Sequence, residues 1–355
     1  MKAIKKIILA SVFALLFLPL SHAQISFDVG GYMQTWYTGW QQTESFAPDG
    51  TIETSEVNGF RIRRSRITAR GRINDTFSAT TWFEFSGPNN NLLDFHFDAN
   101  IYPWLNIRAG QFIMPGQTFD TARLVSSQLA FYERPQVTTR LASVMGYDAF
   151  RDIGVMVYGQ HGRLWYGIHA GNGAGRFTQA GNHITKRDAF GGLYGFRMDY
   201  ELIDGLTLGG HLSTNQQRNV VQRGSDPFDR DRTSWSLRMR SDGLLLSGLF
   251  TQFEYASLAA RDDSRFDLHG FYGEAGYRIT PDWHVLGRYD YYLERPEAGG
   301  RLDADTFTFG ITRYVRHEGR EILRTHLNYS FGESSPGGLS NSILVLVVQV
   351  RFIPI

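Results

Sequence analysis

The sequence predicts an exported, all-β protein: a sixteen-stranded antiparallel transmembrane β-barrel. Three observations support this fold class. The N-terminus has the form of an export signal, apolar and polar residues alternate with a period of two along most of the chain, and the connections between strands are alternately short and long. In lipid, every backbone polar group must be paired within the sheet, so strands that cross a membrane have to close into a barrel.

The N-terminus contains the three parts of a secretory signal peptide. Three lysines among the first six residues precede an apolar stretch over 7–20, and Ser21 and Ala23 occupy the minus-three and minus-one positions of a cleavage site. A membrane anchor is the alternative, but this stretch is too short for a spanning helix. We expect residues 1–23 to be the signal peptide and residues 24–355 to form the barrel domain.

Composition and motif spacing exclude several functions. The chain has 36 Lys+Arg against 35 Asp+Glu, which argues against a nucleic-acid partner, and it has no cysteine, which excludes disulfides and thiol chemistry. The histidines lack metal-ligand spacing, and no Ser, His and acid fall together as in a hydrolase. We therefore expect no enzyme activity, cofactor or metal site, with an outer-membrane hydrolase as an alternative.

The alternation divides the chain into sixteen predicted strands, an even number. They cover residues 26–40, 57–74, 77–86, 91–101, 104–113, 151–159, 163–170, 190–202, 206–215, 232–240, 244–256, 268–279, 283–292, 304–315, 321–331 and 340–352. Both faces of 244–256 and 340–352 are apolar, so the sequence does not decide which of their residues face inward.

The connections are alternately short and long. Tight turns at 74–76, 102–103, 160–162, 203–205, 241–243, 280–282 and 317–319 fall on every second connection. The others are mostly long and polar, and 87–90 is the short exception. Outer-membrane barrels have short periplasmic turns and long outer loops, which places both termini on the periplasmic side.

The two faces of each strand differ in polarity. In 91–101, Phe95 and Phe97 share one face and Asp94 and His96 share the other, which indicates a lipid-facing exterior and a polar lumen. A soluble β-barrel or sandwich is the alternative. Aromatic residues near strand ends fit the girdles at the membrane interfaces: Trp36, Trp40, Trp104, Tyr158, Tyr200 and Trp235.

The stretch GFRIRRSRITARGR, residues 59–72, concentrates six arginines on the second strand. One face carries Ile67 and Ala69 and can meet lipid. An arginine at the middle of the bilayer costs about 2 to 4 kcal/mol on that face. The opposite face must therefore turn to the lumen as an arginine ladder about 26 Å long, formed by Arg64, Arg66, Arg70 and Arg72.

Arg61 and Arg63 break this alternation, and we expect them at the outer rim. Alternatively, the ladder is neutralised by acids on adjacent strands, of which Asp28 and Glu84 are the nearest. The same alternation predicts further inward arginines. They are Arg108, Arg163, Arg197, Arg238, Arg240, Arg278, Arg288, Arg324 and Arg351. Together with the ladder they outnumber the predicted inward acids, which predicts an anion-favouring lumen.

These residues resemble the phosphate-selective porin O/P family of bacterial outer-membrane channels. The resemblance rests on the arginine-rich second strand, IRAGQFIMPG (107–116), FYERP (131–135) and RDIGVMVYG (151–159), which occur in the family's order. It implies a homotrimer in the outer-membrane lipid of a Gram-negative cell, passing anions such as phosphate or polyphosphate along arginines. A nonspecific small-solute porin and a plugged structural or adhesive barrel are the alternatives.

The connection over 114–150 is the longest, and a loop of that length is normally functional. It is the third outer loop, and in sixteen-stranded porins this loop folds inward and sets the constriction. We expect the same here, with Arg123, Arg134 and Arg140 at the narrowest point. An outward surface flap is the alternative. The connection contains no lysine, and the preferred anion stays open.

Overall fold

The computed structural model contains the predicted sixteen strands within the residues that it describes, which are 26–46, 51–87, 91–116, 131–146, 150–176, 192–220, 228–262 and 265–352. The expected signal peptide lies outside the described residues. The strands are β1 (Ser26–Phe46), β2 (Ile52–Arg72), β3 (Phe77–Glu84), β4 (Asn91–Tyr102), β5 (Leu105–Ile113), β6 (Arg151–His161), β7 (Leu164–Gly171), β8 (Leu193–Ile203), β9 (Leu206–Val220), β10 (Phe228–Asp242), β11 (Leu249–Ala260), β12 (Phe266–Thr280), β13 (Trp283–Pro296), β14 (Leu302–His317), β15 (Arg320–Ser334) and β16 (Leu339–Phe352).

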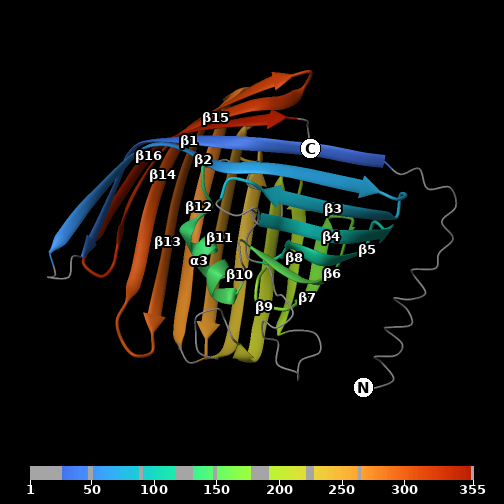
Figure 1. Ribbon diagram of the computed structural model, residues 1–355, viewed down its shortest axis with the longest axis horizontal. Helices are drawn as coiled ribbons and strands as arrows, with labels where there is room; N and C mark the ends of the chain where they lie inside the picture. Colours follow the sequence, from blue (N-terminus) through green and yellow to red (C-terminus); the bar gives the residue numbers. More distant parts are fainter. Residues whose placement is uncertain are drawn as a thin grey trace.

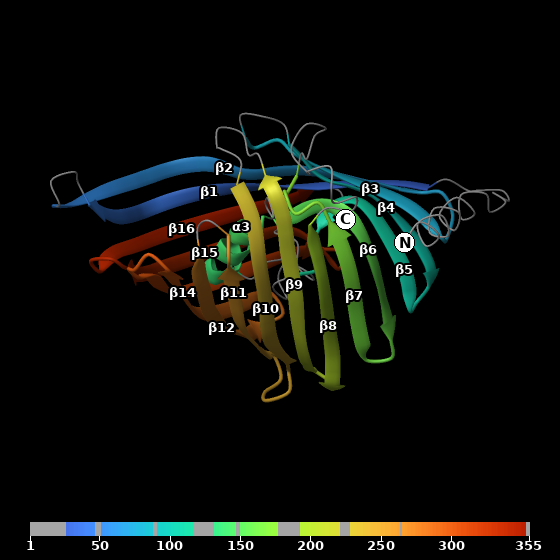
Figure 2. The same cartoon turned by 90° about the horizontal axis from the view of Figure 1, so that it is seen from below.

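Each strand pairs with its neighbours in sequence, and β1 pairs antiparallel with β16 to close the barrel. Figure 1 shows the strands wrapped around a central space that contains the helix α3 (Gln136–Met145), and Figure 2 shows the same arrangement from below. Among the described residues, no helix is long and apolar enough to cross a membrane.

Strand boundaries differ from the prediction mainly at the long-loop end. The backbone pairing of β1 with β2 continues through the polar residues at that end, so β1 extends to Phe46 and β2 begins at Ile52. The prediction of a strand over 244–256 is shifted, because Gly243 and Gly248 have φ of 71° and 84° and frame a turn ahead of β11. Positive φ is accessible to glycine at little cost, which explains why the apolar residues 244–246 do not extend the strand.

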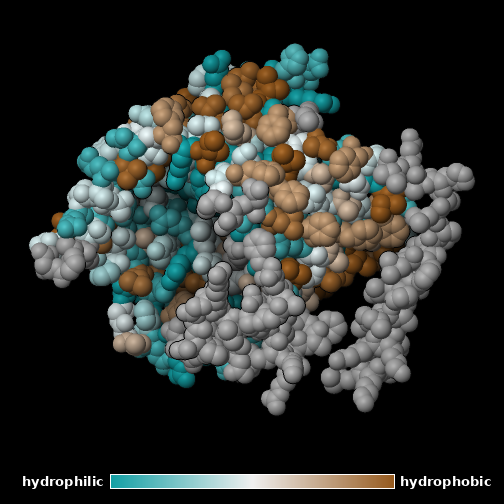
Figure 3. Space-filling view, viewed as in Figure 1, coloured by the Kyte–Doolittle hydropathy of each residue, from teal (hydrophilic) through white to brown (hydrophobic). Residues whose placement is uncertain are grey.

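The outer surface is apolar, as expected for contact with lipid. Ile168, Leu212 and Leu237 are each more than half exposed, and Figure 3 shows hydrophobic side chains over β3–β5 beside a hydrophilic recess. Of the predicted girdle residues, Trp40, Trp104, Tyr200 and Trp235 are exposed on the outside. The prediction is wrong for Trp36 and Tyr158, which face the interior.

A relay of hydrogen bonds crosses the closure between the first and last strands. Arg64 donates to the Gln34 amide oxygen at 2.7 Å, and Gln34 donates to Gln349 at 2.6 Å. Gln349 in turn donates to Glu321 on β15 at 3.5 Å. Gln34 and Gln349 are buried. An interior amide contributes to stability only when it is paired, so this relay fixes the seam.

Gln349→Leu is expected to lower the free energy of barrel unfolding by about 1 to 3 kcal/mol, because the buried Gln34 amide loses its acceptor. Urea unfolding in lipid vesicles measures the change. Gln42→Leu is the matched control, since Gln42 of β1 donates to Glu56 of β2 in an exposed pair away from the closure. Equal destabilisation by both substitutions would contradict a special role for the closure relay.

Candidate functional site

The C-terminal part of β2, from Arg64 to Arg72, has the predicted division into an outward and an inward face. Ile67 is 38% exposed on the outer surface, whereas Arg66 contacts the inward-facing Tyr32 and Glu84. Arg70 and Arg72 share the inner face with Arg66 and are exposed. These side chains therefore lie on the lumen wall, and their exposure is to the aqueous interior of the barrel.

A β-bulge at Arg63 corrects the prediction that Arg61 and Arg63 lie at the outer rim. Gln34 pairs with Arg64 and the next residue on β1 pairs with Ile62, so β2 has one extra residue at this point. The extra residue shifts the alternation by one position, so that Arg61 faces the same side as Arg64 and Arg66. The Arg61 guanidinium lies 4.5 Å from the ring centroid of Trp36, which faces inward, so Arg61 belongs to the inner wall.

The outer part of the arginine ladder is paired with carboxylates. Arg66 contacts Glu84 at 2.6 Å, as one of the alternatives predicted. Arg63 and Arg64 contact the two carboxylate oxygens of Glu133 at 2.7 and 3.0 Å. Glu133 lies in the long connection after β5, so the ladder holds this connection against the wall.

The Glu133 carboxyl has a lowered pKa. Burial acts to raise it, but the positive charges of Arg64 and Arg63 outweigh this effect. Glu133 lies in a connection rather than in a spanning strand. Because the pKa in the folded protein is lowered, the contribution of this anchor to stability is fully present above the ordinary pKa of a glutamate, and it is lost only as the pH falls through the lowered value.

Acidification is therefore expected to leave single-channel conductance unchanged until the pH falls below about 4, the ordinary range for glutamate. Below that range, protonation of Glu133 releases the connection and changes the conductance. Recordings across a pH series measure this transition. The same recordings on Glu133→Gln separate this group from other carboxyls, because the variant should lack the transition; a transition that persists unchanged would contradict the assignment.

The helix α3 packs on the inner wall through one face. Val137, Leu141 and Met145 are buried in one cluster with Leu268 and Tyr272 of β12, both of which point inward. The opposite face carries the exposed residues Gln136, Thr139 and Ser143. The described part of the connection, 131–146, therefore contacts the barrel interior and presents a polar surface to it.

Both ends of α3 meet charges that suit the helix dipole. At the N-terminus, the Gln136 backbone N–H donates to the Asp290 carboxylate at 3.0 Å. At the C-terminus, Arg232 donates to the Val144 carbonyl oxygen. An anion at the N-terminus and a cation at the C-terminus stabilise a helix. Gly146 ends it with φ of 92°, where a Cβ would lie 2.5 Å from Arg230.

The predicted constriction residues divide into three cases. Arg140 on α3 donates to Glu294 of β13 at 2.6 and 2.9 Å. The Arg134 guanidinium lies 4.8 Å from the ring centroid of Phe150. Arg123 lies outside the described residues.

Several of the other predicted pore arginines lie beside acids. Arg108 contacts Asp98 at 2.6 Å, and Arg324 contacts Glu321 at 2.5 Å. Further pairs on the inner wall are Arg197 with Asp199, Arg238 with Glu254 at 4.0 Å, Arg288 with Asp290 and Arg351 with Glu321. These carboxylates reduce the local excess of positive charge.

Arg163 and Arg240 differ from this group. Arg163 lies in the turn between β6 and β7 and contacts Asp204 of a neighbouring turn, so it sits at the short-turn rim rather than on a strand. Arg240 lies on the inner face of β10, in register with Gln252. In the described part of the chain, Arg240 makes no ion pair within 4.0 Å.

Several inward acids were not predicted from the sequence. Glu254 lies on β11, whose inward face the sequence did not decide, and it is 1% exposed. Glu133 and Glu294 are close to the long connection and pair with its arginines or with those of β2. No signal in the local sequence identifies such partners, because they are far apart along the chain. Within the described ranges, no group of three or more His, Asp or Glu side chains could hold a metal ion.

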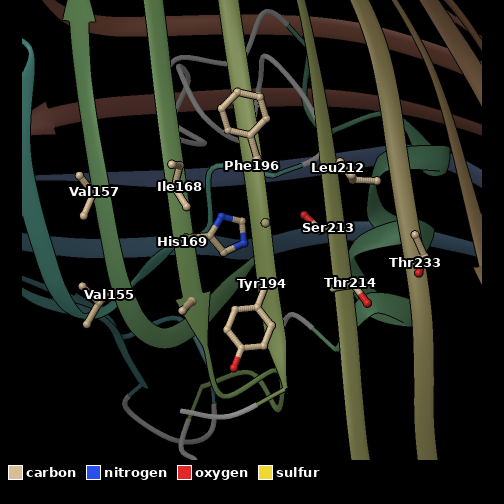
Figure 4. Close-up of a pocket in the computed structure, with 12 residues that line it drawn as sticks. Val155, Val157, Ile168, His169, Tyr194, Phe196, Leu212, Ser213, Thr214 and Thr233 are labelled. Carbon is tan, nitrogen blue, oxygen red and sulfur yellow. The ribbon is translucent and has the colours of Figure 1, made fainter. Parts of the chain in front are cut away.

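A separate groove of about 470 Å³ lies on the outer surface between β6 and β10. Figure 4 shows the outward side chains Ile168, Phe196 and Leu212 around it, with the His169 ring among them. His169 lies against Gly195, where a Cβ would be 2.2 Å from the imidazole. The groove is apolar and faces the membrane side, so it is not part of the lumen.

The barrel and its polar inner wall agree with a comparison against known families. A family model described as Gram-negative porin matches residues 10–317. The chain belongs to the Gram-negative porin family. This porin is accordingly an outer-membrane channel protein, and its family favours a channel over an enzyme. The family matched is this broader one and not the phosphate-selective O/P family that the sequence resembles.

Several solved structures share this fold. An anion-selective porin from Comamonas acidovorans has a TM-score of 0.66 at 15% identity, covering 93% of this chain and 100% of that one. Salmonella typhi OmpF, in complex with daunomycin, has a TM-score of 0.66 at 14% identity, covering 92% and 97%. A trimer form of OmpT from Vibrio cholerae has a TM-score of 0.62 at 10% identity, covering 92% and 99%. The comparison with curated proteins found no match.

Proposed function

We propose that this porin forms a water-filled diffusion channel that favours anions, including phosphate-like oxyanions. The observation that carries the proposal is the set of inward arginines without an ion pair. Within the described residues, Arg70, Arg72, Arg240 and Arg278 have no carboxylate within 4.0 Å. All four lie near the short-turn ends of their strands. A wet passage lined by one sign of charge raises the local concentration of ions of the opposite sign.

The proposal includes the rest of the expected assembly. The signal peptide over residues 1–23 directs export and is cleaved, and the mature chain forms a homotrimer, as OmpT of Vibrio cholerae does in its trimer form. The arginine ladder of β2 forms part of the wall, and the connection that carries Arg134 and Arg140 narrows the passage. The contacts of residues 131–146 with the inner wall support this placement.

A nonspecific small-solute channel is the second candidate. It is favoured by the number of lumen arginines that pair with acids, among them Arg66 with Glu84 and Arg108 with Asp98. Such pairs contribute little net charge to the passage. The two candidates therefore differ in whether the unpaired arginines dominate the field that a permeating ion experiences.

Planar-bilayer recording of the purified protein distinguishes the candidates. In a potassium chloride gradient, an anion-favouring channel shows a reversal potential displaced toward the chloride equilibrium potential, and phosphate reduces the chloride current. A nonspecific porin shows a reversal potential near zero and no reduction by phosphate. A plugged barrel shows no conductance, which would overturn the proposal entirely.

A further inference from the structure

The six arginines of β2 are in two different states. In the outer group, Arg63 and Arg64 share Glu133, and Arg66 is bound by Glu84. Arg61 stacks on the buried Trp36. These guanidiniums hold the long connection and the barrel wall together. Glu133 and Glu84 hold Arg63, Arg64 and Arg66 in ion pairs and offset part of the charge, so these three arginines are less available to a solute than unpaired ones.

In the inner group, Arg70 and Arg72 are exposed, and within the described residues they have no ion pair within 4.0 Å. They are alternate residues of one strand, so their backbones are about 6.6 Å apart on the same face. A guanidinium presents several donors in a planar fork that matches an oxyanion, and it cannot lose its proton. Two neighbouring forks can therefore donate to one oxyanion.

The adjacent strand supplies hydroxyl groups at the same levels. Thr80 is the register partner of Arg70, and Ser78 is the register partner of Arg72. Thr80 is 8% exposed, and its buried hydroxyl has no hydrogen-bond partner among the residues that the structure describes. Interior polar groups are almost always paired, so an unpaired hydroxyl beside two free arginines is a donor available to a ligand.

On the other side, Asp28 is the register partner of Arg70 but is not within ion-pairing distance of it. Asp28 offsets part of the positive charge at long range. Net charge alone is then a weak basis for distinguishing one anion from another. The fork geometry of the arginines and the hydroxyl of Thr80 favour a multivalent oxyanion over chloride.

We propose that Arg70 and Arg72, with Thr80, form an oxyanion-binding station in the short-turn, periplasmic half of the lumen. The arginines from Arg61 to Arg66 serve the architecture of the wall. This inference rests on the proposed function, since it places the anion preference of the channel at a particular site. It separates the anion site from the narrow region beside the long connection.

Phosphate block of chloride current, recorded with inorganic phosphate on wild type and three variants, tests the station. R70Q/R72Q is expected to raise the phosphate concentration for half block about tenfold, since each unit charge about 6 Å from an ion in water accounts for roughly threefold. R70K/R72K keeps both charges, so its reversal potential should match wild type, while its phosphate block weakens because the forks are lost. R261Q/R265Q removes two exposed arginines of the β11–β12 connection and is the matched control.

Two results would overturn the station. One is unchanged phosphate block in R70Q/R72Q while wild type is blocked. The other is loss of block in the charge-neutral variant R66Q/E84Q, which would place the site in the outer group. The reversal potential of wild type tests the proposed function separately: if it is displaced toward chloride but R70Q/R72Q has no effect, the channel still favours anions and only the station is wrong.

Discussion

Replacing both Arg70 and Arg72 by glutamate is expected to convert the porin from an anion-favouring to a cation-favouring channel. Each substitution changes the wall charge by two units at a site exposed to the lumen. A unit charge about 6 Å from an ion in water changes its local concentration roughly threefold, so four units should change the local concentrations of anions and cations on the order of 100-fold each, in opposite directions, and the permeability ratio by the product of the two. The reversal potential in a potassium chloride gradient measures this ratio directly.

Assembly should survive this change, because Arg70 and Arg72 form no ion pair in the described part of the chain whose loss would leave a buried charge. Heat-modified mobility of the trimer on a gel checks assembly. The control R261E/R265E places the same charges at the outer connection and should leave the selectivity near that of wild type. A reversal potential that does not move in R70E/R72E would show that these arginines do not face the ion path.

Glu133→Gln is expected to release the connection over 131–146 from β2 and to increase single-channel conductance. The carboxylate accepts hydrogen bonds from Arg63 at 2.7 and 3.0 Å and from Arg64 at 3.0 Å. Hydrogen bonds to charged groups contribute about 1.5 to 3 kcal/mol each. Arg64 is 3% exposed, so removing its anion also leaves a buried charge without compensation.

Single-channel recording and its open-state noise measure this release. Glu297→Gln is the matched control, because Glu297 pairs with Arg265 at 3.5 Å and both side chains are 64% exposed. Exposed pairs contribute little to stability, so the control should behave as wild type. A conductance unchanged by Glu133→Gln would mean that packing of α3 on β12, rather than the ion pairs, holds the connection in place.

The strands are predictable because lipid and water impose opposite demands on alternate residues. Phe95 and Phe97 face outward and His96 faces inward for this reason alone, and the pattern needs no knowledge of distant partners. Polarity does not assign the inner faces of β11 and β16 in this way. Val345 and Val347 are apolar and yet face inward, so polarity could not assign that face from the sequence.

The bulge at Arg63 and the pairing of the ladder depend on tertiary structure. Two consecutive arginines, Arg63 and Arg64, do interrupt the alternation, but a bulge and the end of the membrane-spanning part produce the same pattern in a sequence. Glu133 is 69 residues from Arg64 along the chain. Their contact determines which arginines remain free for solutes, and only the folded arrangement of the connection reveals it.

The sequence of α3 contains a local pattern that is typical of a helix. Val137, Leu141, Val144 and Met145 recur at helical spacing within the long connection, and all four are buried in the structure. A single ten-residue segment of this kind is too short to be stable alone. Its helical form depends on the inner wall, where Gly270 leaves room for Val137: a Cβ at residue 270 would lie 2.7 Å from the Val137 side chain.

Cysteine accessibility along β2 tests most directly whether its arginines line a water-filled path. The chain has no cysteine, so single substitutions give a clean signal. In lipid bilayers, a negatively charged, membrane-impermeant thiol reagent should modify Arg70→Cys and Arg72→Cys and reduce the anion current, while Ala69→Cys and Gly71→Cys remain unmodified. Modification of Ala69→Cys and Gly71→Cys instead, or of all four variants alike, would contradict the division of this strand into a lipid face and a lumen face.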